Sequence, residues 1–330
     1  MKPFKSSLSW SAGVLLFASA VLAQSTIDDE IHKEFAVKTA GKVTLEADRG
    51  AIEIRTGESD SVRITVNRKV SRISKVEAEE IFKDHEITFD QTGDEVIIRA
   101  KFKGNTGKIW NRRNINLNVH YMVTVPRKYN LDVKTSGGNI SIPDIDGEAR
   151  ARTSGGNIDL GKIEGLVAAK TSGGSITLKG GAASAELETS GGNITVGEVA
   201  GHVMAQTSGG SIKINKSIGD VVAKTSGGGI NLADVSGKLE AFTSGGSITA
   251  RLSQQPKGNC SVETSGGSID VQLADSIRVD LDASTSGGRV TTDFPVEGGS
   301  NKSSLRTAIN GGGPVLVLKT SGGNVRVRKL

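Results

Sequence analysis

The sequence is poor in the residues that usually stabilise a small domain or fill a large globular core. Cys260 is the single cysteine, so no internal disulfide can form and stability must come from burial and hydrogen bonding. Aromatic residues make up only 4% of the chain, which leaves Ile, Val, Leu, Ala and Thr to build the core. A core of that composition suits thin repeated layers better than one globule.

Long hydrophobic runs are also missing, with one exception at the N-terminus. Lys2 and Lys5 precede an apolar run from Ala12 to Leu22, which is the pattern of a secretory signal peptide over residues 1–23, cleaved after Ala23. The run is shorter than the roughly 20 residues of a membrane span, and no later segment reaches that length. We expect an exported chain, periplasmic or extracellular, that is soluble after cleavage. The alternative is an uncleaved N-terminal anchor.

Strong charge and clustered histidines are absent as well. Loss of the two signal lysines lowers the formal net charge from +5 to +3, a surplus too small to predict a nucleic-acid or other polyanion partner. The four histidines are scattered, which disfavours a metal site or a catalytic triad: His32, His85, His120 and His202. We expect no cofactor and no metal.

Glycine is abundant, and much of it lies in a repeated TSGG motif. The motif recurs every eighteen residues and then at wider spacings, starting at Thr135, Thr153, Thr171, Thr189, Thr207, Thr225, Thr243, Thr264, Thr285 and Thr320. A degenerate copy, NGGG, begins at Asn310. A fixed period of this length is typical of a solenoid.

Alignment of the coils, counting Thr as position 1, shows apolar residues two apart. Position 6 is isoleucine in seven successive coils, position 8 is aliphatic, and positions 15 and 17 carry small aliphatic residues such as Val167 and Ala169. Such alternation on short segments predicts strands, with the intervening polar residues facing water. We expect about three short strands and two or three bends in each coil.

The TSGG motif is predicted to form a corner of each coil. Alternate residues of a strand face the same side, so Thr faces inward with positions 15 and 17 of the preceding coil. Position 6 also faces inward but lies an odd number of residues after Thr, so the chain must bend between them. Glycine allows either a positive φ or a tight backbone path there. Stacking would also place Thr, Ser and Asn side chains above their copies, as ladders that share hydrogen bonds. The corner residues that we single out are Thr153, Gly155, Gly156, Thr171, Gly173, Gly174, Thr189, Gly191 and Gly192.

The segment before the repeats differs, and we predict that residues 24–130 cap a solenoid of residues 131–330. ADRGAIEI, residues 47–54, looks like an eroded coil. Ser74 and Glu77 form a capping box that opens a helix to about His85. Strands are expected around 87–89, 96–102 and 115–125. At the other end, the charged NVRVRKL is expected to protect an exposed edge of the stack.

The TSGG repeats, the run NLNVHYMVTVPRKYNLDVKTSGGNI and the closing INGGGPVLVLKTSGGNVRV together resemble the bacterial "putative adhesin" family of β-strand-repeat proteins, a domain of unknown function. The likeness runs from about Val43 to Leu330. It implies an exported all-β parallel β-solenoid, β-helix-like, here with coils of about 18 residues and a small N-terminal α/β cap containing one helix. It brings no catalytic or ligand-binding residues with it.

Catalysis is not indicated by the repeat columns. Polysaccharide-active β-helix enzymes use clustered carboxylates on one face of the stack. Position 7 shows no two acids on adjacent coils, since it reads Ser141, Asp159, Thr177, Thr195, Lys213, Asn231, Thr249 and Asp270. We therefore expect a non-catalytic scaffold or adhesin-like protein in the cell envelope. The alternatives are a polysaccharide-active enzyme and an ice- or water-binding solenoid.

Two surfaces are candidates for binding a cell-surface glycan or an envelope protein. One is the flat ladder of Asn, Ser and Thr at positions 5 and 7, for which an ordinary solvated sheet face is the competing interpretation. The other is a basic loop around a tryptophan, for which the competing interpretation is a solvated hairpin tip. Its candidate residues are Lys101, Lys103, Lys108, Trp110, Arg112 and Arg113.

Overall fold

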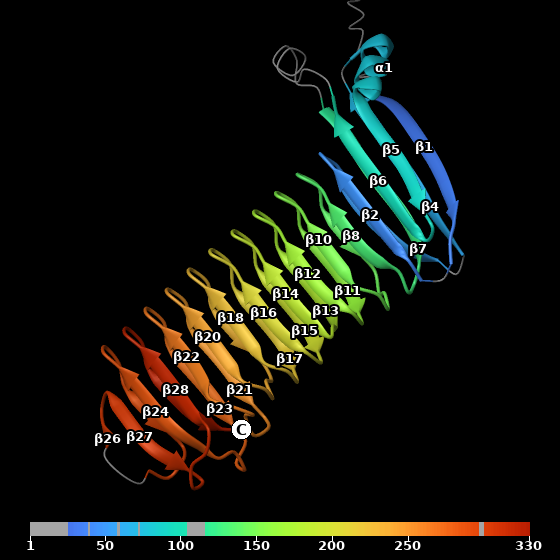
Figure 1. Cartoon of the computed structure of the whole chain (residues 1–330). Helices are drawn as coiled ribbons and strands as arrows, with labels where there is room; N and C mark the ends of the chain where they lie inside the picture. The colour runs from blue at the N-terminus through green and yellow to red at the C-terminus, as the bar shows by residue number, and fades with distance from the viewer. Residues whose placement is uncertain (1–25, 39, 58–59, 72, 104–115, 297–299) are drawn as a thin grey trace, which may run out of the picture.

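The computed structural model describes residues 26–330 apart from residues 39, 58–59, 72, 104–115 and 297–299. This part of the chain forms an elongated solenoid made of two long sheets (Figure 1). Each central coil contributes one strand to each sheet, and the buried aliphatic side chains lie between the sheets. The predicted all-β parallel β-solenoid is confirmed.

The strands of the first sheet, in spatial order, are β1 (Thr26–Ala36), β4 (Ser61–Ser71), β7 (Asn116–Pro126), β3 (Ala51–Gly57), β9 (Ile140–Ile142), β11 (Ile158–Ile163), β13 (Ile176–Gly181), β15 (Ile194–Val199), β17 (Ile212–Ser217), β19 (Ile230–Leu232), β21 (Ile248–Leu252), β23 (Ile269–Leu273), β29 (Val325–Lys329) and β25 (Val290–Thr292). Those of the second sheet are β26 (Ser300–Asn301), β27 (Ser304–Ile309), β24 (Val279–Thr285), β28 (Val315–Thr320), β22 (Cys260–Thr264), β20 (Leu239–Thr243), β18 (Val221–Thr225), β16 (His202–Gln206), β14 (Ser184–Glu188), β12 (Leu166–Lys170), β10 (Ala149–Arg152), β8 (Asn130–Lys134), β2 (Lys42–Ala47), β6 (Glu95–Phe102) and β5 (His85–Thr92).

Successive coils pair in parallel and in register, so equivalent side chains stack. Ile158 of β11 pairs with Ile176 of β13, and Ala151 of β10 pairs with Ala169 of β12. The position-6 isoleucines and the position-17 alanines are at most 2% exposed. Bulky side chains of the first sheet and small ones of the second therefore fill the space between the sheets.

The structure has two strands in each central coil, not the three that were expected. The parity break near Gly161 is real, because Leu160 and Gly161 are both buried. It lies inside β11, where pairing with β13 skips Gly161 and resumes at Lys162. One unpaired residue is enough to turn the following side chain, Ile163, back toward the core. The bend therefore interrupts the ladder locally without ending the strand.

Each TSGG threonine points inward, as parity predicts, and joins its coil to the preceding level. Thr171 is 2% exposed, and its Oγ1 donates a hydrogen bond of 2.9 Å to the carbonyl oxygen of Gly156. The same hydroxyl accepts from the N–H of Gly174 at 3.4 Å. Every TSGG threonine donates such a bond to a glycine carbonyl. The threonine hydroxyls therefore join successive coils, as expected of a ladder, but they bond to backbone carbonyls and not to one another.

The two glycines of the motif have different roles. A Cβ at Gly156 would lie on the carbonyl oxygen of Gly138, far inside the 3.0 Å that real Cβ atoms respect. A Cβ at Gly155 would lie 3.6 Å from the nearest atom, the carbonyl oxygen of Gly137, which is ordinary contact. Among the described residues, no TSGG glycine has a positive φ. The corner thus needs glycine for close stacking of coils, the second of the two reasons considered from the sequence.

The N-terminal region completes one end of the stack. β2 and β3 form the eroded coil, pairing in parallel with β8 and β9. Helix α1 (Lys75–Asp84) begins at Ser74 with both hydrogen bonds of the predicted capping box, and it is the one helix among the described residues. It leads from β4 of the first sheet to β5 of the second, across the end of the solenoid (Figure 1). Antiparallel strands β1 and β5 form the outer edges there.

At the opposite end, the last coil of the chain is not the last coil of the stack. β28 lies between β22 and β24, and β29 lies between β23 and β25 (Figure 1). The corners agree, because Thr320 donates to Gly267 while Thr285 donates to Gly323. The prediction that NVRVRKL protects an exposed edge is therefore wrong. Its Arg328 Nη2 instead bonds both carboxylate oxygens of Asp270 at 2.8 Å.

The degenerate NGGG motif is not an eroded corner. Asn310, Gly311 and Gly312 have φ values of 53°, 88° and 78°, and they form the turn from β27 to β28. Asn310 Nδ2 donates to the carbonyl oxygens of Asp275 and Ile277, which holds this turn against the body. Positive φ at two glycines identifies a turn, whereas the TSGG corners have none.

Gly156→Ala tests the close-stacking argument, with Gly155→Ala as its matched control one residue away. Because an added methyl group at Gly156 meets backbone that cannot rotate away, we expect a loss of about 2–4 kcal/mol in the free energy of unfolding. The control is expected to stay within about 1 kcal/mol of the parent. Denaturant unfolding followed by far-UV circular dichroism measures both. Equal losses in the two variants would contradict the assignment.

Thr171→Val tests the bond between coils. Valine keeps the shape of threonine but leaves the Gly156 carbonyl and the Gly174 N–H without their hydroxyl partner. A loss of about 1–3 kcal/mol is expected. Thr177→Val, on the outward side of β13, is the control and is expected to change the stability by less than about 0.5 kcal/mol. A neutral Thr171→Val variant would show that the hydroxyl does not hold the coils together.

Candidate functional site

The predicted basic loop is only partly described by the structure. Lys108, Trp110, Arg112 and Arg113 lie outside the described residues. Lys101 and Lys103, the other two candidates, are exposed at and just beyond the end of β6. The Nζ of Lys103 contacts Glu86 Oε2 at 2.5 Å, so its charge is already paired.

The Asn and Ser ladder at position 5 has a structural role. Asn157 Oδ1 accepts a hydrogen bond from the backbone N–H of Ser175 at 2.9 Å, and Ser175 Oγ accepts from the N–H of Asn193 at 3.1 Å. The ladder continues along much of the first sheet in the same way. These side-chain oxygens already accept hydrogen bonds from the next coil and are less available to a ligand. The neighbouring position-7 column is interrupted by charged residues such as Asp159 and Lys213.

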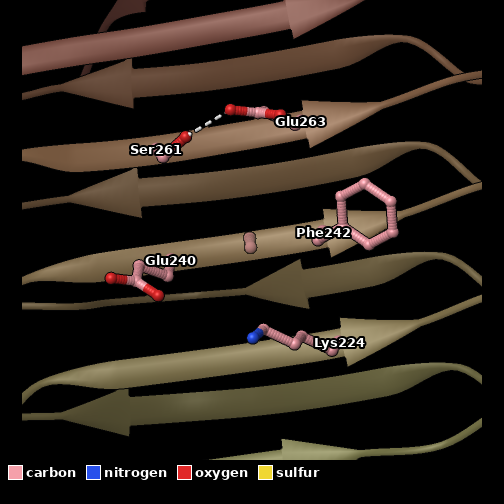
Figure 2. A pocket seen from close by; sticks show the side chains of 6 residues that line it. Lys224, Glu240, Phe242, Ser261 and Glu263 are labelled. Atoms are coloured by element: carbon pink, nitrogen blue, oxygen red, sulfur yellow. Dashed lines mark hydrogen bonds between the residues drawn. The ribbon is translucent and has the colours of Figure 1, made fainter.

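A groove on the outer face of the second sheet is better suited to a ligand. It has a volume of about 330 Å³ and is lined by Lys224, Glu240, Ala241, Phe242, Ser261 and Glu263, from strands β18, β20 and β22 (Figure 2). In-register pairing places Phe242 between Lys224 and Glu263 on the adjacent strands. Figure 2 shows the phenyl ring projecting from the sheet with the charged side chains to either side.

Phe242 is 43% exposed, which is unusual for a large apolar side chain. It occupies position 18 of its coil, directly before the next TSGG. In the five preceding coils this position is polar or charged: Arg152, Lys170, Glu188, Gln206 and Lys224. The sequence therefore carried a signal for this site, because Phe242 is the one apolar residue in that column of the regular coils. The outward columns compared above, positions 5 and 7, do not include it.

Both carboxylates of the groove make a close side-chain contact. Glu240 Oε1 and Lys238 Nζ lie 2.7 Å apart, and this hydrogen bond and the lysine charge lower the pKa of the Glu240 carboxyl. The same contact raises the pKa of Lys238. Glu263 Oε1 accepts a hydrogen bond of 2.8 Å from Ser261 Oγ (Figure 2). The groove therefore offers carboxylate acceptors and ammonium donors around one aromatic ring.

A second hollow adjoins the groove across Phe242. Its volume is about 290 Å³, and it continues along the same column past Lys224 and Gln206 to Glu188. Its border is the corner ridge, including Ser190 and Ser208. From β14 to β22 the two hollows together cross five strands, which is roughly 19 Å at the usual strand spacing.

One carboxylate of the groove, Glu240, does not fit the general acid of glycoside hydrolysis. A hydrolase of this kind uses a carboxylic acid whose pKa is raised so that it can donate a proton. Glu240 has a lowered pKa and is a poor proton donor near neutral pH. Among the described residues there is also no cluster of three or more His, Cys, Asp or Glu side chains that could hold a metal ion.

A buried polar cluster lies in the N-terminal region, and sequence analysis missed it. His85, 1% exposed, ends α1, and its Nε2 lies 3.2 Å from the hydroxyl of Tyr121. Its Nδ1 has no hydrogen-bond partner among the described residues. Arg68 bonds the carbonyl oxygens of Phe82 and His85 and, through Nε and Nη2, Asp29. This guanidinium therefore joins β1, β4, α1 and β5.

Burial lowers the pKa of His85 to about 4, assisted by the positive charges of Arg68 and Arg49 and opposed by Asp48. Burial likewise raises the pKa of Tyr121 well above its usual value. The imidazole is consequently neutral at neutral pH. Protonation would add a third positive charge to a buried space that already holds two guanidinium groups.

The groove and the stacked coils define a parallel β-solenoid repeat protein with a ligand-sized hollow on one sheet face. The sequence model of the Toastrack DUF4097 family matches residues 41–328, and the chain belongs to that family. No curated protein matches the sequence. Within the described residues, no helix has the length and apolar character needed to cross a membrane.

Several solved structures are similar over most of their length. A "putative adhesin" from Bacteroides fragilis is 12% identical, with 92% of this chain and 97% of that chain covered and a TM-score of 0.33. A "putative cell adhesion protein" from Clostridium sporogenes is 14% identical, with coverage of 92% and 100% and a TM-score of 0.29. A "Putative lipid binding protein" from Parabacteroides distasonis is 13% identical, with coverage of 92% and 97% and a TM-score of 0.30. Adhesion and lipid binding are named here as roles of those three proteins.

Acidification tests the buried histidine. The folded-state pKa of His85, about 4, lies below the ordinary value of 6.5, so the unfolded chain takes up the proton first. Stability is therefore expected to fall as the pH drops from 6.5 to 4, by up to about 3 kcal/mol, and this contribution stays constant below pH 4.

Hydrogen exchange in α1 and β5 across this pH range measures the loss of stability locally. His85→Phe is expected to remove the histidine part of the pH dependence, whatever its effect on overall stability. His202→Phe, on the outer face of β16, is the control and should keep the parent's pH profile. Identical profiles for the parent and His85→Phe would show that His85 is not the acid-sensitive group.

Proposed function

We propose that this protein is an exported, non-catalytic, adhesin-like scaffold that presents a binding surface in the cell envelope. The observation that carries the proposal is the groove around Phe242 on the outer face of a continuous, fully paired sheet. Ligand sites usually combine an apolar or aromatic surface with a few fixed polar groups, and this groove has both. The secretory pattern of residues 1–23 supports export.

A rigid backbone favours binding at a non-catalytic surface. Neighbouring strands hold the lining side chains in register, and the threonine and Asn/Ser bonds fix each coil on the last. Binding then requires little ordering of the protein backbone, which lowers the entropic cost of association. A cell-surface glycan and an envelope protein are the two partner classes that fit an exposed face of this kind.

The basic loop is a separate candidate surface within the same proposal. Lysine and arginine side chains around Trp110 suit an anionic envelope polymer, whereas the groove carries balanced charge. The two surfaces can therefore be separated by salt, because screening weakens exposed charge contacts much more than contacts of a neutral ring.

Cell fractionation and an envelope pull-down test the proposal together. The full chain is expected in the periplasmic or extracellular fraction, and deletion of residues 2–23 is expected to keep it in the cytoplasm. The mature protein should be retained by purified envelope material at low and at high salt. A Trp110→Ala, Arg112→Ala double variant should show weaker envelope retention at low salt if the loop binds an anionic polymer. Cytoplasmic location of the full chain, or no retention at either salt concentration, would contradict the proposal.

A further inference from the structure

We propose that the groove at Phe242 and the hollow beside it bind an extended, uncharged oligosaccharide, with a sugar ring stacked on the phenyl ring. This inference rests on the proposed function, since it names the ligand class of that binding surface. Three features of the described residues carry it: an exposed ring in a polar column, balanced charge around the ring, and a hollow several strands long.

The exposed ring is not explained by the stability of the fold. The side chain of Phe242 points away from the core, while its neighbour Ala241 is 2% exposed and fills the inward position. A flat apolar surface held in this way fits the C–H face of a pyranose ring, because the partial positive charge on those hydrogens meets the negative face of the aromatic ring. An aliphatic side chain would offer area without this preference.

The groups beside the ring match the hydroxyl rim of a sugar. The Glu263 carboxylate can accept hydrogen bonds from two sugar hydroxyl groups, and the hydrogen bond from Ser261 fixes its orientation from one side. Lys224, on the opposite side of the ring, makes no ion pair within the described residues and keeps its donors available. A ring with acceptors on one side and donors on the other suits neighbouring hydroxyl groups on one sugar.

The net charge around the groove favours an uncharged ligand. Glu240 and Glu263 carry two negative charges, which Lys224 and Lys238 balance. A polyanion would meet the carboxylates and a polycation would meet the ammonium groups. Since the Glu240–Lys238 pair is exposed and self-satisfied, it contributes to the rim without demanding a charged partner.

The length of the surface favours a chain over a single sugar. Phe242 lines both hollows, and together they run from β22 to β14. Beyond the ring the ligand would meet Gln206, whose amide both donates and accepts, and the hydroxyl groups of the corner serines. A hydrogen-bonding strip of that kind can contact several successive sugar units.

Binding to defined oligosaccharides tests this inference. Probes are chitohexaose, cellohexaose, laminarihexaose and mannohexaose, with hexagalacturonate as the anionic comparison, measured by titration calorimetry. At least one neutral hexasaccharide is expected to bind, and more tightly than its disaccharide. Phe242→Ala should lower that affinity by about tenfold or more, and Glu263→Gln should lower it by a smaller factor.

Two variants guard against trivial outcomes. Phe242→Trp keeps an aromatic face, so it should retain binding and report it through a change in tryptophan fluorescence. Leu166→Ala removes another exposed apolar side chain of the same sheet, 48% exposed on β12, and should bind like the parent. Circular dichroism melts establish that all variants fold, which their surface positions favour.

The outcomes separate this inference from the proposed function. Envelope retention that Phe242→Ala leaves unchanged, or binding of hexagalacturonate alone, would overturn the groove assignment while the scaffold proposal stands. Capture of an envelope protein or of lipid vesicles without any neutral hexasaccharide would overturn it as well. Absence of both envelope retention and oligosaccharide binding would overturn both.

Discussion

The whole structure depends on each coil lying one strand spacing from the coil before it, all the way round its perimeter. Strands meet this spacing readily, because backbone hydrogen bonds set it at about 4.8 Å. Corners cannot reach this spacing if they carry a side chain, because that side chain would collide with the backbone of the adjacent corner. Gly156 stacks on Gly138 with no room for a methyl group, and the same contact recurs up the stack. Thr153, three residues before Gly156, donates a hydrogen bond to the same Gly138 carbonyl oxygen, and Thr171 does the same one coil further on.

This constraint separates the inward columns from the outward ones. Inward positions must stay apolar, because they are buried between the sheets, although their size varies between coils, as from Ala149 to Leu239 at position 15. Outward positions can differ from coil to coil at little cost, as long as they remain solvated. A functional residue in such a protein is therefore expected as an exception in an outward column. Phe242 is such an exception, next to Lys224 and Glu263 in a column that is otherwise polar.

The same division explains what the sequence could and could not predict. Inward Thr171, buried Ile176 and the capping box of Ser74 follow from parity and local chemistry, and the structure confirms them. The bend inside β11 was located correctly but was expected to separate two strands, because periodicity locates a change of phase and does not say whether pairing stops there. The His85 cluster was not foreseen, since it joins β1, β4, α1, β5 and β7 through contacts between residues distant in sequence.

The groove was missed for a different reason. Its residues come from three successive coils, so their proximity was available from the repeat. The aromatic exception lies at position 18, whereas the outward columns compared from the sequence were positions 5 and 7. Its charge balance, in contrast, needed the structure. Whether Lys238 pairs with Glu240 along its own strand or with an acid on the next coil is decided by side-chain conformation.

The ends of the stack are built differently from its parallel middle. Parallel strands leave unpaired backbone at both ends, which favours association between molecules. Antiparallel strands and α1 occupy one end. At the other end the second sheet finishes in the antiparallel strands β27 and β26, and the first sheet finishes in the short parallel strand β25. Insertion of β28 and β29 one level inward gives the C-terminal coil partners on both sides, and the N–H of Leu330 still bonds to Leu273. The outermost level is thus formed by β24, β25 and β27, which precede β28 and β29 in the chain.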